Sequence, residues 1–285
     1  MELHPETSGF QIKNAKIPIT IAMKRLEFLK PHEEIIEEEL LSLSRSISRD
    51  KVLRHPLVAD FKTGVVLDGN HRLVALKQMN CRLAPVALVD YRNPEIMIER
   101  WYRVVRSAKL DDLQVRLQGH GLNMRYEDPA TAAELLNRRR VAAVIEDQAR
   151  SLVFSSQSQE PLDCFRTSFS VETFLRQTGL SVSYLDKKPE IIPEDTLILS
   201  TIKLEKEEVV AVASSGRLYP PKSTRHLIPS RPLGTRVPIE WLAIDKPQLA
   251  QAKLIDHLGK MKLRRAEKGS IVGSRKYEEE VFVFE

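Results

Sequence analysis

Five consecutive residues, Asp68-Gly69-Asn70-His71-Arg72, combine an acid, a glycine and three hydrogen-bonding side chains. Apolar residues at 65–67 and 73–76 flank them, which predicts a strand, a tight turn and the first turn of a helix. The first amides of a helix have no partners within it, the helix dipole attracts negative charge, and a glycine lets an anion approach closely. The motif therefore predicts a phosphate-binding turn, and an ordinary turn with a surface arginine is the alternative.

The elements before this motif must position any partner for it. Isoleucines at every second position over 17–21 predict a first strand over 17–23. Pro31 and the acids after it favour the start of an amphipathic helix that runs to about Arg49, with Glu33 near its beginning. Glu33 is then either a helix-start acid or a functional carboxylate. Further strands are expected over 55–59 and 84–91, and a helix-like run over 94–99.

The rest of the chain predicts a second α/β region. Asp128-Pro129 precedes a helical pattern that reaches Val144 and carries Arg138-Arg139-Arg140. This arginine run is either a solvated helix face or a nucleic-acid contact. A strand over 151–154, a polar loop over 155–160, and helix or turn elements at 171–178 and 213–215 follow. An amphipathic helix over 249–263 and the apolar run 281–284 make up the tail.

Composition sets broad limits. The 285 residues, 42% of them hydrophobic, suffice for one large or two modest domains. No apolar run approaches the ~20 residues of a membrane helix, so we expect a cytoplasmic protein without membrane contact. Cys81 and Cys164 lack metal-ligand spacing and are expected to be structural. A net charge of +5 permits an anionic ligand or nucleic acid, but no dinucleotide fingerprint or P-loop motif occurs.

Four blocks together resemble the free-serine kinase branch of the ParB/sulfiredoxin-like fold family. They are Lys30-Pro31-His32-Glu33, Asp68 to Arg72, Ala84-Pro85-Val86 to Asp90-Tyr91, and Leu218-Tyr219-Pro220-Pro221-Lys222-Ser223-Thr224-Arg225-His226. The resemblance spans about 17–242. This branch usually has histidine where this chain has Asn70, and residues beyond 242 look like an extension. The motif has no cysteine, which argues against sulfiredoxin-type chemistry, because that reaction needs a thiolate.

The resemblance implies an α/β (α+β) fold, with a ParB/sulfiredoxin-like nucleotide-binding domain over 1–105 and a second α/β domain over 106–242. The two would form a cleft that holds the site, and 243–285 would be a C-terminal extension. The implied reaction is phosphorylation of free L-serine to O-phospho-L-serine with ADP or ATP and Mg²⁺. The implied catalytic residues are Glu33, as general base, and Asp68. Gly69, Asn70, His71 and Arg72 would bind the nucleotide phosphates.

The resemblance also implies a substrate-binding group that comprises Trp101, Lys222, Ser223, Thr224, Arg225 and His226. Phosphoryl transfer needs an anion cradle, a metal ion and a carboxylate beside the hydroxyl, and the sequence offers candidates for the first and last. The alternative function is a ParB-like DNA-binding transcriptional regulator, which fold kinship and the basic isoelectric point motivate. No convincing helix-turn-helix follows residue 105, so we do not expect nucleic-acid binding. The sequence predicts neither metal ligands nor an oligomeric state.

Overall fold

The computed structural model describes residues 9–273 and 275–285, which form two compact units. Unit 1 contains residues up to 97, 209–218 and 226–285, and unit 2 contains 98–208 and 219–225. Four elements lie where the chain passes between units or close to it: β7 (Met97–Glu99), α6 (Lys206–Ser214) and β14 (Arg225–Leu227), with β8 (Tyr102–Arg106) just inside unit 2. The expected division into 1–105, 106–242 and 243–285 stays a prediction.

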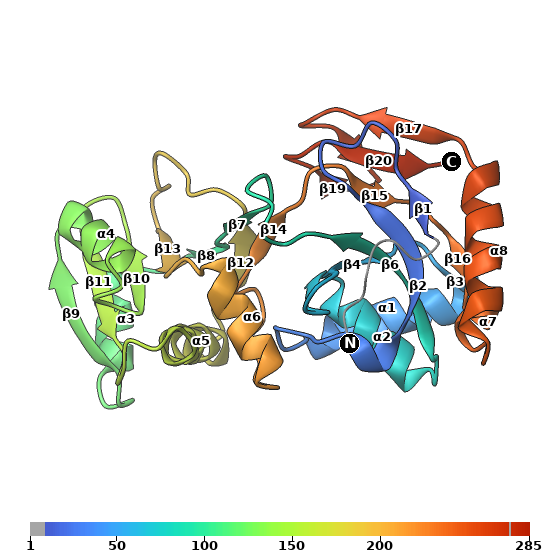
Figure 1. Ribbon diagram of the computed structural model, residues 1–285. Helices are drawn as coiled ribbons and strands as arrows, with labels where there is room; N and C mark the ends of the chain where they lie inside the picture. Colours follow the sequence, from blue (N-terminus) through green and yellow to red (C-terminus); the bar gives the residue numbers. More distant parts are fainter. Residues whose placement is uncertain (1–8, 274) are drawn as a thin grey trace. The chain divides into compact units, whose positions relative to one another are not determined.

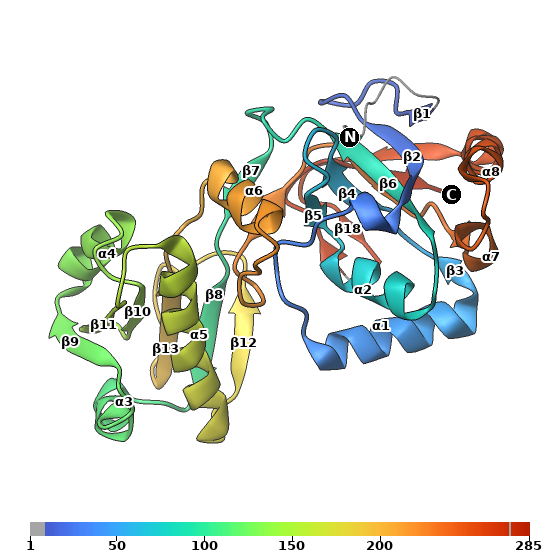
Figure 2. The same ribbon diagram turned by 60° about the horizontal axis from the view of Figure 1, so that its bottom comes forward.

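A five-stranded mixed sheet organises unit 1 (Figures 1 and 2). Its order is β1 (Phe10–Gln11), β2 (Thr20–Arg25), β6 (Leu83–Val89), β4 (Leu57–Asp60) and β5 (Val66–Asp68). Strand β6 is buried along its whole length, as expected of a central strand that is covered on both faces. It pairs in parallel with β4 and antiparallel with β2. Strand β5, at one edge, ends at Asp68, the first residue of the Asp68-Gly69-Asn70-His71-Arg72 motif.

Helices cover this sheet. They are η1 (Leu26–Phe28), α1 (Glu37–Asp50), α2 (Asn70–Gln78), α7 (Ile239–Leu242) and α8 (Pro247–Lys260). Three glutamates in the first turn of α1 complement the positive end of its dipole. Helix α8 packs along β2, where Gln251 Oε1 accepts a hydrogen bond from the Met23 amide at 2.6 Å. The expected tail helix therefore packs on the body of unit 1.

The C-terminal residues also build a small sheet in unit 1. Its order is β15 (Arg231–Leu233), β20 (Val281–Phe284) and β17 (Leu263–Ala266). Strand β20 is buried throughout and pairs in parallel with β15, with Val281 opposite Arg231. Two shorter pairs complete the unit, β3 (Val52–Leu53) with β16 (Val237–Pro238) and β18 (Ile271–Val272) with β19 (Arg275–Lys276).

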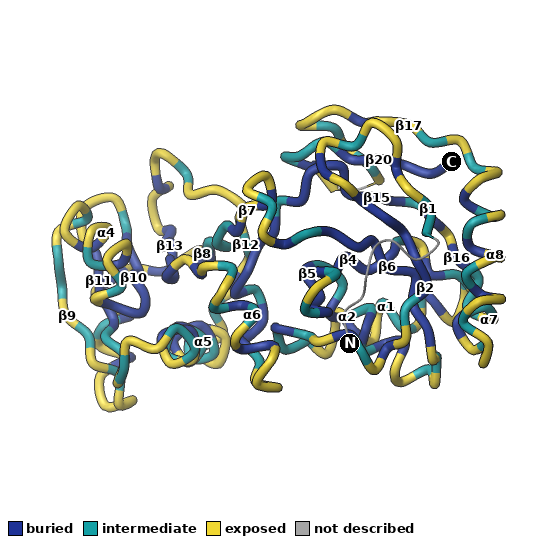
Figure 3. Tube along the Cα trace, in the orientation of Figure 1, coloured by how far each residue is buried: buried dark blue, intermediate teal, exposed yellow. Residues whose placement is uncertain are grey.

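Unit 2 is an antiparallel six-stranded sheet with helices (Figure 1). The order is β12 (Val182–Leu185), β8, β13 (Thr196–Thr201), β10 (Ala143–Glu146), β11 (Ser151–Ser155) and β9 (Asn123–Glu127). The helices are α3 (Leu110–Leu117), α4 (Pro129–Asn137) and α5 (Pro161–Gln177). The core contains buried residues of the central strands, α3 and α5, among them Leu113, Phe154 and Leu175. Figure 3 colours the buried stretches of the chain dark blue. Both cysteines are free, Cys81 in unit 1 and the buried Cys164 in unit 2.

Three local expectations were wrong. Helix α1 begins at Glu37, so Glu33 lies four residues before it, in an extended segment. Residues 94–99 are a turn followed by β7 instead of a helix, and the Asn93 side chain accepts a hydrogen bond from the Glu95 amide in that turn. The helix after Asp128 ends at Asn137, because Arg139 adopts a positive φ of 55° and Val144 pairs within the sheet as part of β10.

Candidate active site

The strand, turn and helix expected around Asp68 are all present in unit 1. Strand β5 ends at Asp68 and α2 begins at Asn70. Between them Gly69 has φ +105°, a conformation that side chains rarely adopt, and a Cβ there would lie 2.9 Å from Arg72 Nε. Gly69 has no side chain to cap the helix, so the helix start keeps the backbone geometry that suits an anion.

Two arginines hold Asp68. Its Oδ2 lies 2.7 Å from Arg72 Nη2 and 2.9 Å from Arg231 Nη1. Burial alone would raise the pKa of this carboxyl, but the charges of Arg72 and Arg231 outweigh it and hold the pKa well below its usual range. Arg72 also donates to the Pro56 carbonyl oxygen. Asp68 is therefore ionised at neutral pH, and the guanidinium of Arg72 lies at the start of α2.

A buried histidine lies beside Glu33. His32 is 1% exposed, and its Nδ1 donates to the Val66 carbonyl oxygen at 2.7 Å. That bond directs Nε2 toward Glu33, whose Oε1 is 3.7 Å away. Burial lowers the pKa of His32, while the negative charges of Glu33 and Asp68 oppose this shift. Both predicted catalytic acids thus act on one imidazole, which places them in the same part of unit 1.

Asn70 and His71 have different surroundings. Asn70 is 9% exposed, and its Nδ2 lies 3.4 Å from His32 Nδ1. Its Oδ1 is buried without a hydrogen-bond partner among the described residues. His71 Nε2 accepts a hydrogen bond from the Ile36 amide at 2.9 Å, just before α1 begins. His71 therefore also connects α2 to α1, a structural role that its neighbours in the sequence do not indicate.

His226 extends the polar cluster of unit 1. Its Nε2 lies 2.7 Å from the Tyr91 hydroxyl, and its ring meets that of His32 edge to face at 5.4 Å. Its carbonyl oxygen accepts a hydrogen bond from Arg231 Nη2 at 2.8 Å. The structure thus brings His226 together with His32, next to the predicted catalytic acids. Arg231 and Tyr91 belong to this cluster as well, and the sequence analysis assigned neither a role at the site.

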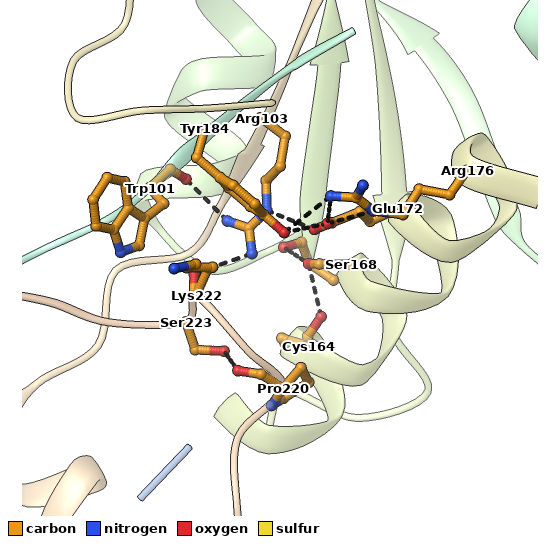
Figure 4. A network of polar contacts seen from close by, with 11 residues as sticks. Trp101, Arg103, Cys164, Ser168, Glu172, Arg176, Tyr184, Pro220, Lys222 and Ser223 are labelled. Atoms are coloured by element: carbon orange, nitrogen blue, oxygen red, sulfur yellow. Dashed lines mark hydrogen bonds and ion pairs between the residues drawn. The ribbon is translucent and has the colours of Figure 1, made fainter. Parts of the chain in front are cut away.

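The other substrate-binding candidates belong to unit 2, and Figure 4 shows Trp101, Lys222 and Ser223 among them. Trp101 Nε1 donates to the Thr224 carbonyl oxygen at 2.9 Å. The Lys222 ammonium lies over the rings of Trp101 and Tyr184, 5.9 and 5.8 Å from their centroids. The Arg225 guanidinium lies 5.7 Å from the Trp101 centroid and is ion-paired with Asp186. One indole therefore orders the loop that carries both cations.

The buried Arg103 holds this loop through hydrogen bonds to its backbone. Its guanidinium, 3% exposed, donates to the carbonyl oxygens of Trp101 and Lys222 at 2.9 and 3.1 Å. Its Nε pairs with Glu172 Oε2 at 2.9 Å, and Arg176 and Tyr184 bond the other oxygen of that carboxylate (Figure 4). No sequence motif marks Arg103 or Glu172. Their charges are satisfied by each other, so they support the loop without facing solvent.

Ser223 serves the same loop. Its hydroxyl, in a side chain 2% exposed, donates to the Pro220 carbonyl oxygen at 2.7 Å (Figure 4). Lys222 adopts a positive φ of 60° just before it. These contacts shape a tight turn that presents Lys222.

Residues 9–273 and 275–285 contain no group of three or more histidine, cysteine or acidic side chains that could hold a metal ion. Within the same residues, no helix has the length and apolar character needed to cross a membrane.

Comparison with solved structures defines the class of fold. A free serine kinase in complex with ADP superimposes with a TM-score of 0.67 at 22% identity, covering 84% of this chain and 98% of that one. SbnI from Staphylococcus aureus gives 0.67 at 19% identity, covering 84% and 95%. The chain therefore has the α/β fold of the free serine kinases and of SbnI, as the sequence predicted.

Curated proteins give more particular relatives. The ADP-dependent L-serine kinase SerK of Thermococcus kodakarensis is 25% identical over 222 residues, 76% of this chain and 90% of that one. An ATP-dependent L-serine kinase of Staphylothermus marinus is 23% identical, with 75% and 88% covered. A ParB-like protein of Sulfolobus acidocaldarius is 20% identical, with 75% and 93% covered. No family model matches. The resemblance to free serine kinases is confirmed.

Proposed function

We propose that this protein is a kinase that phosphorylates free L-serine to O-phospho-L-serine, with an adenine nucleotide as phosphoryl donor. Its relatives carry the names of ADP- and ATP-dependent L-serine kinases, and a solved structure with the same fold holds ADP. The observation that carries the proposal is the Asp68-Gly69-Asn70 turn at the start of α2, with the Asp68 carboxylate held by Arg72 and Arg231 and with Glu33 beside the buried His32. We also propose a cytoplasmic location, where free serine and nucleotides are available.

In this mechanism the start of α2 and Arg72 bind the terminal phosphates. The uncapped amides and the helix dipole are already oriented, so they stabilise negative charge without reorganisation. Glu33 orients the serine hydroxyl and accepts its proton as the hydroxyl attacks phosphorus. Asp68, held ionised between Arg72 and Arg231, is the second catalytic acid of this proposal and contacts the substrate or metal region. We assign the binding of the serine to Trp101 and the segment Lys222–His226.

Mg²⁺ fits this site as a companion of the nucleotide. Magnesium commonly keeps several waters and is held by substrate phosphates with one or two carboxylates. Asp68 and Glu33 are the carboxylates available for that purpose, and the described residues offer no larger set of ligands. When bound, the ion would neutralise developing charge on the phosphates.

The DNA-binding alternative finds no support in the arginine run at 138–140. Arg138 pairs with Glu134, and Arg139 pairs with both Glu208 and Glu205. Because these acids neutralise two of the three arginines, the run is not a free basic patch of the kind that binds phosphate backbones.

The first test is direct detection of the product. The protein is incubated with L-serine, Mg²⁺ and either ADP or ATP, and O-phosphoserine is measured by mass spectrometry. We expect product with at least one nucleotide, and the more effective nucleotide identifies the donor. Absence of product with both nucleotides, from folded protein across mesophilic and thermophilic temperatures, would rule out the kinase.

The Glu33→Gln variant tests the proposed base. Removal of a general base typically costs ~10²–10⁴-fold in rate, so kcat is expected to fall within that range while the fold is retained. The matched control is Glu37→Gln, an exposed acid in the first turn of α1, which should keep wild-type kcat. Equal rates in the two variants would remove Glu33 from the mechanism.

A further inference from the structure

Arg231 joins the predicted catalytic acid to the C-terminal part of the chain. It opens β15, the strand that pairs with β20, and is 3% exposed. One end of its guanidinium, Nη1, lies 2.9 Å from Asp68 Oδ2. The other end, Nη2, lies 3.1 Å from Glu279 Oε1 and donates to the His226 carbonyl oxygen at 2.8 Å. A single buried cation thus lies between the acid at the functional turn and an acid just before β20.

Glu279 belongs to the stretch expected to be an extension of the kinase core. The serine kinase relatives of T. kodakarensis and S. marinus are matched over 88–90% of their length, but over only 75–76% of this chain. Glu279 is 8% exposed in side chain, so it lies among the buried groups of unit 1. Residues 263–285 therefore supply an inward-facing charge that an exposed tail would not need.

The negative charge of Glu279 helps to hold the buried Arg231 guanidinium in place. A buried guanidinium is stable only when carboxylates and carbonyls satisfy it, and removal of one partner leaves it free to move toward the others. With Glu279 on one side and Asp68 on the other, Arg231 is fixed in position and in turn fixes Asp68. Without Glu279, Arg231 would retain Asp68 and the His226 carbonyl oxygen but lose the second carboxylate that balances its buried charge.

We propose that Glu279 is a positioning residue for Asp68 that acts through Arg231. The C-terminal sheet β15–β20–β17 then contributes to the kinase site by holding Asp68 in place. This inference rests on the proposed function. Glu279 does not itself touch substrate. Its effect is expected in kcat, because Asp68 is needed in the phosphoryl-transfer step.

The test compares two neighbouring glutamates. Glu279→Gln removes the charge that faces Arg231 and keeps the side-chain shape. The control is Glu280→Gln, because Glu280 accepts a hydrogen bond from Ser230 Oγ and pairs with Arg265. We expect Glu279→Gln to lower kcat about tenfold with little change in KM for L-serine. Glu280→Gln is expected to keep wild-type kcat. Circular dichroism confirms that each variant is folded.

A double-mutant cycle separates positioning from a general loss of stability. If Glu279 acts through Arg231, then Glu279→Gln has little further effect on kcat in an Arg231→Lys background. Glu279→Asp, which keeps the charge, should recover part of the lost rate. Independent, multiplicative effects of the two substitutions, or a wild-type rate in Glu279→Gln, would overturn the inference. An inactive wild-type protein would instead refute the kinase function itself.

Discussion

Asp68 lies between two guanidinium groups that come from distant parts of the chain, Arg72 of α2 and Arg231 of β15. Because these charges lower its pKa in the folded state, ionised Asp68 stabilises the fold at every pH above its ordinary pKa of 3.8. That contribution is lost progressively as the pH falls below 3.8 toward the lowered pKa of the folded state. Asp68 therefore makes the stability of unit 1 decrease in acid.

The variant Asp68→Asn tests this linkage. At pH 7 it should lower the free energy of unfolding by about 1–3 kcal/mol, because the buried Arg231 and the largely buried Arg72 lose their carboxylate. The difference from the wild type should shrink as the pH falls below 3.8, where the wild-type carboxyl is protonated on unfolding. Urea unfolding at pH 7, 4 and 3 measures it. A difference that stays constant with pH would show that the ionised Asp68 carboxylate is not its cause. The control is Asp256→Asn, because Asp256 forms an exposed ion pair with Lys260.

Residue roles were only partly predictable from sequence. The acid, glycine and donors of 68–72 are adjacent, so a strand-to-helix turn brings them together whatever the rest of the fold does. Arg231 contacts Asp68 across more than 160 positions in the sequence, and Arg103 is separated from Glu172 by 69 positions. Burial of such a charge pair has no local signature. Trp101 lies just before β8, two residues from Arg103, so the two-residue alternation of an extended chain could have indicated Arg103.

Among the elements, the turn before α2 requires glycine at position 69. Gly69→Ala would impose a side chain at φ +105° and a contact of 2.9 Å with Arg72 Nε. We expect a loss of roughly 1–2 kcal/mol in stability, together with weaker ADP binding, because Arg72 and the helix start must shift.

Gly216→Ala is a matched control for this substitution. Gly216 also has a positive φ, +74°, but a Cβ there meets nothing within 4 Å. It should therefore show the backbone cost and keep wild-type affinity for ADP. Calorimetric titration with ADP measures both variants, and equal affinities in the two would show that the turn does not contact the nucleotide.

Element boundaries were predictable where a local signal exists. Asp128 caps α4 by accepting hydrogen bonds from the amides of Ala130 and Thr131, and Pro129 follows it, as the sequence indicates. The other end of α4 was misplaced because the apolar residues at 141–145 fit a helix and a strand equally well. Their pairing with β11 and β13 decides for the strand, and that pairing depends on residues far along the chain.

At the scale of the whole molecule, each unit is assembled from separate stretches of chain. Residues 226–285 supply α8 along β2, the sheet β15–β20–β17, and Arg231 beside Asp68. We therefore propose that 1–105 is incomplete as a folding unit, although it contains the whole five-stranded sheet. By contrast, 98–208 contains all six strands of the sheet of unit 2 and most of its core.

Two fragments test this proposal. The fragment 98–208 should unfold cooperatively in urea, whereas 1–105 should not, because its β1 and β2 lose the cover of α8. Addition of 226–285 in trans should restore structure to 1–105. Cooperative unfolding of 1–105 by itself would instead favour the division at residue 105 that the sequence suggested. Circular dichroism at increasing urea concentration distinguishes the outcomes.

The two cysteines give this chain its own pair of reporters. One thiol lies in each unit, Cys81 partly exposed in unit 1 and Cys164 2% exposed in unit 2, and burial raises the pKa of both. Alkylating reagents, which react with the thiolate form of cysteine, attack such groups slowly until the surrounding structure opens. The rate of alkylation at Cys164 therefore measures the opening of unit 2. An increase in the rate of alkylation at Cys81 measures the opening of unit 1. Peptide mapping after labelling would follow the two units separately in the unmodified protein, without an engineered probe.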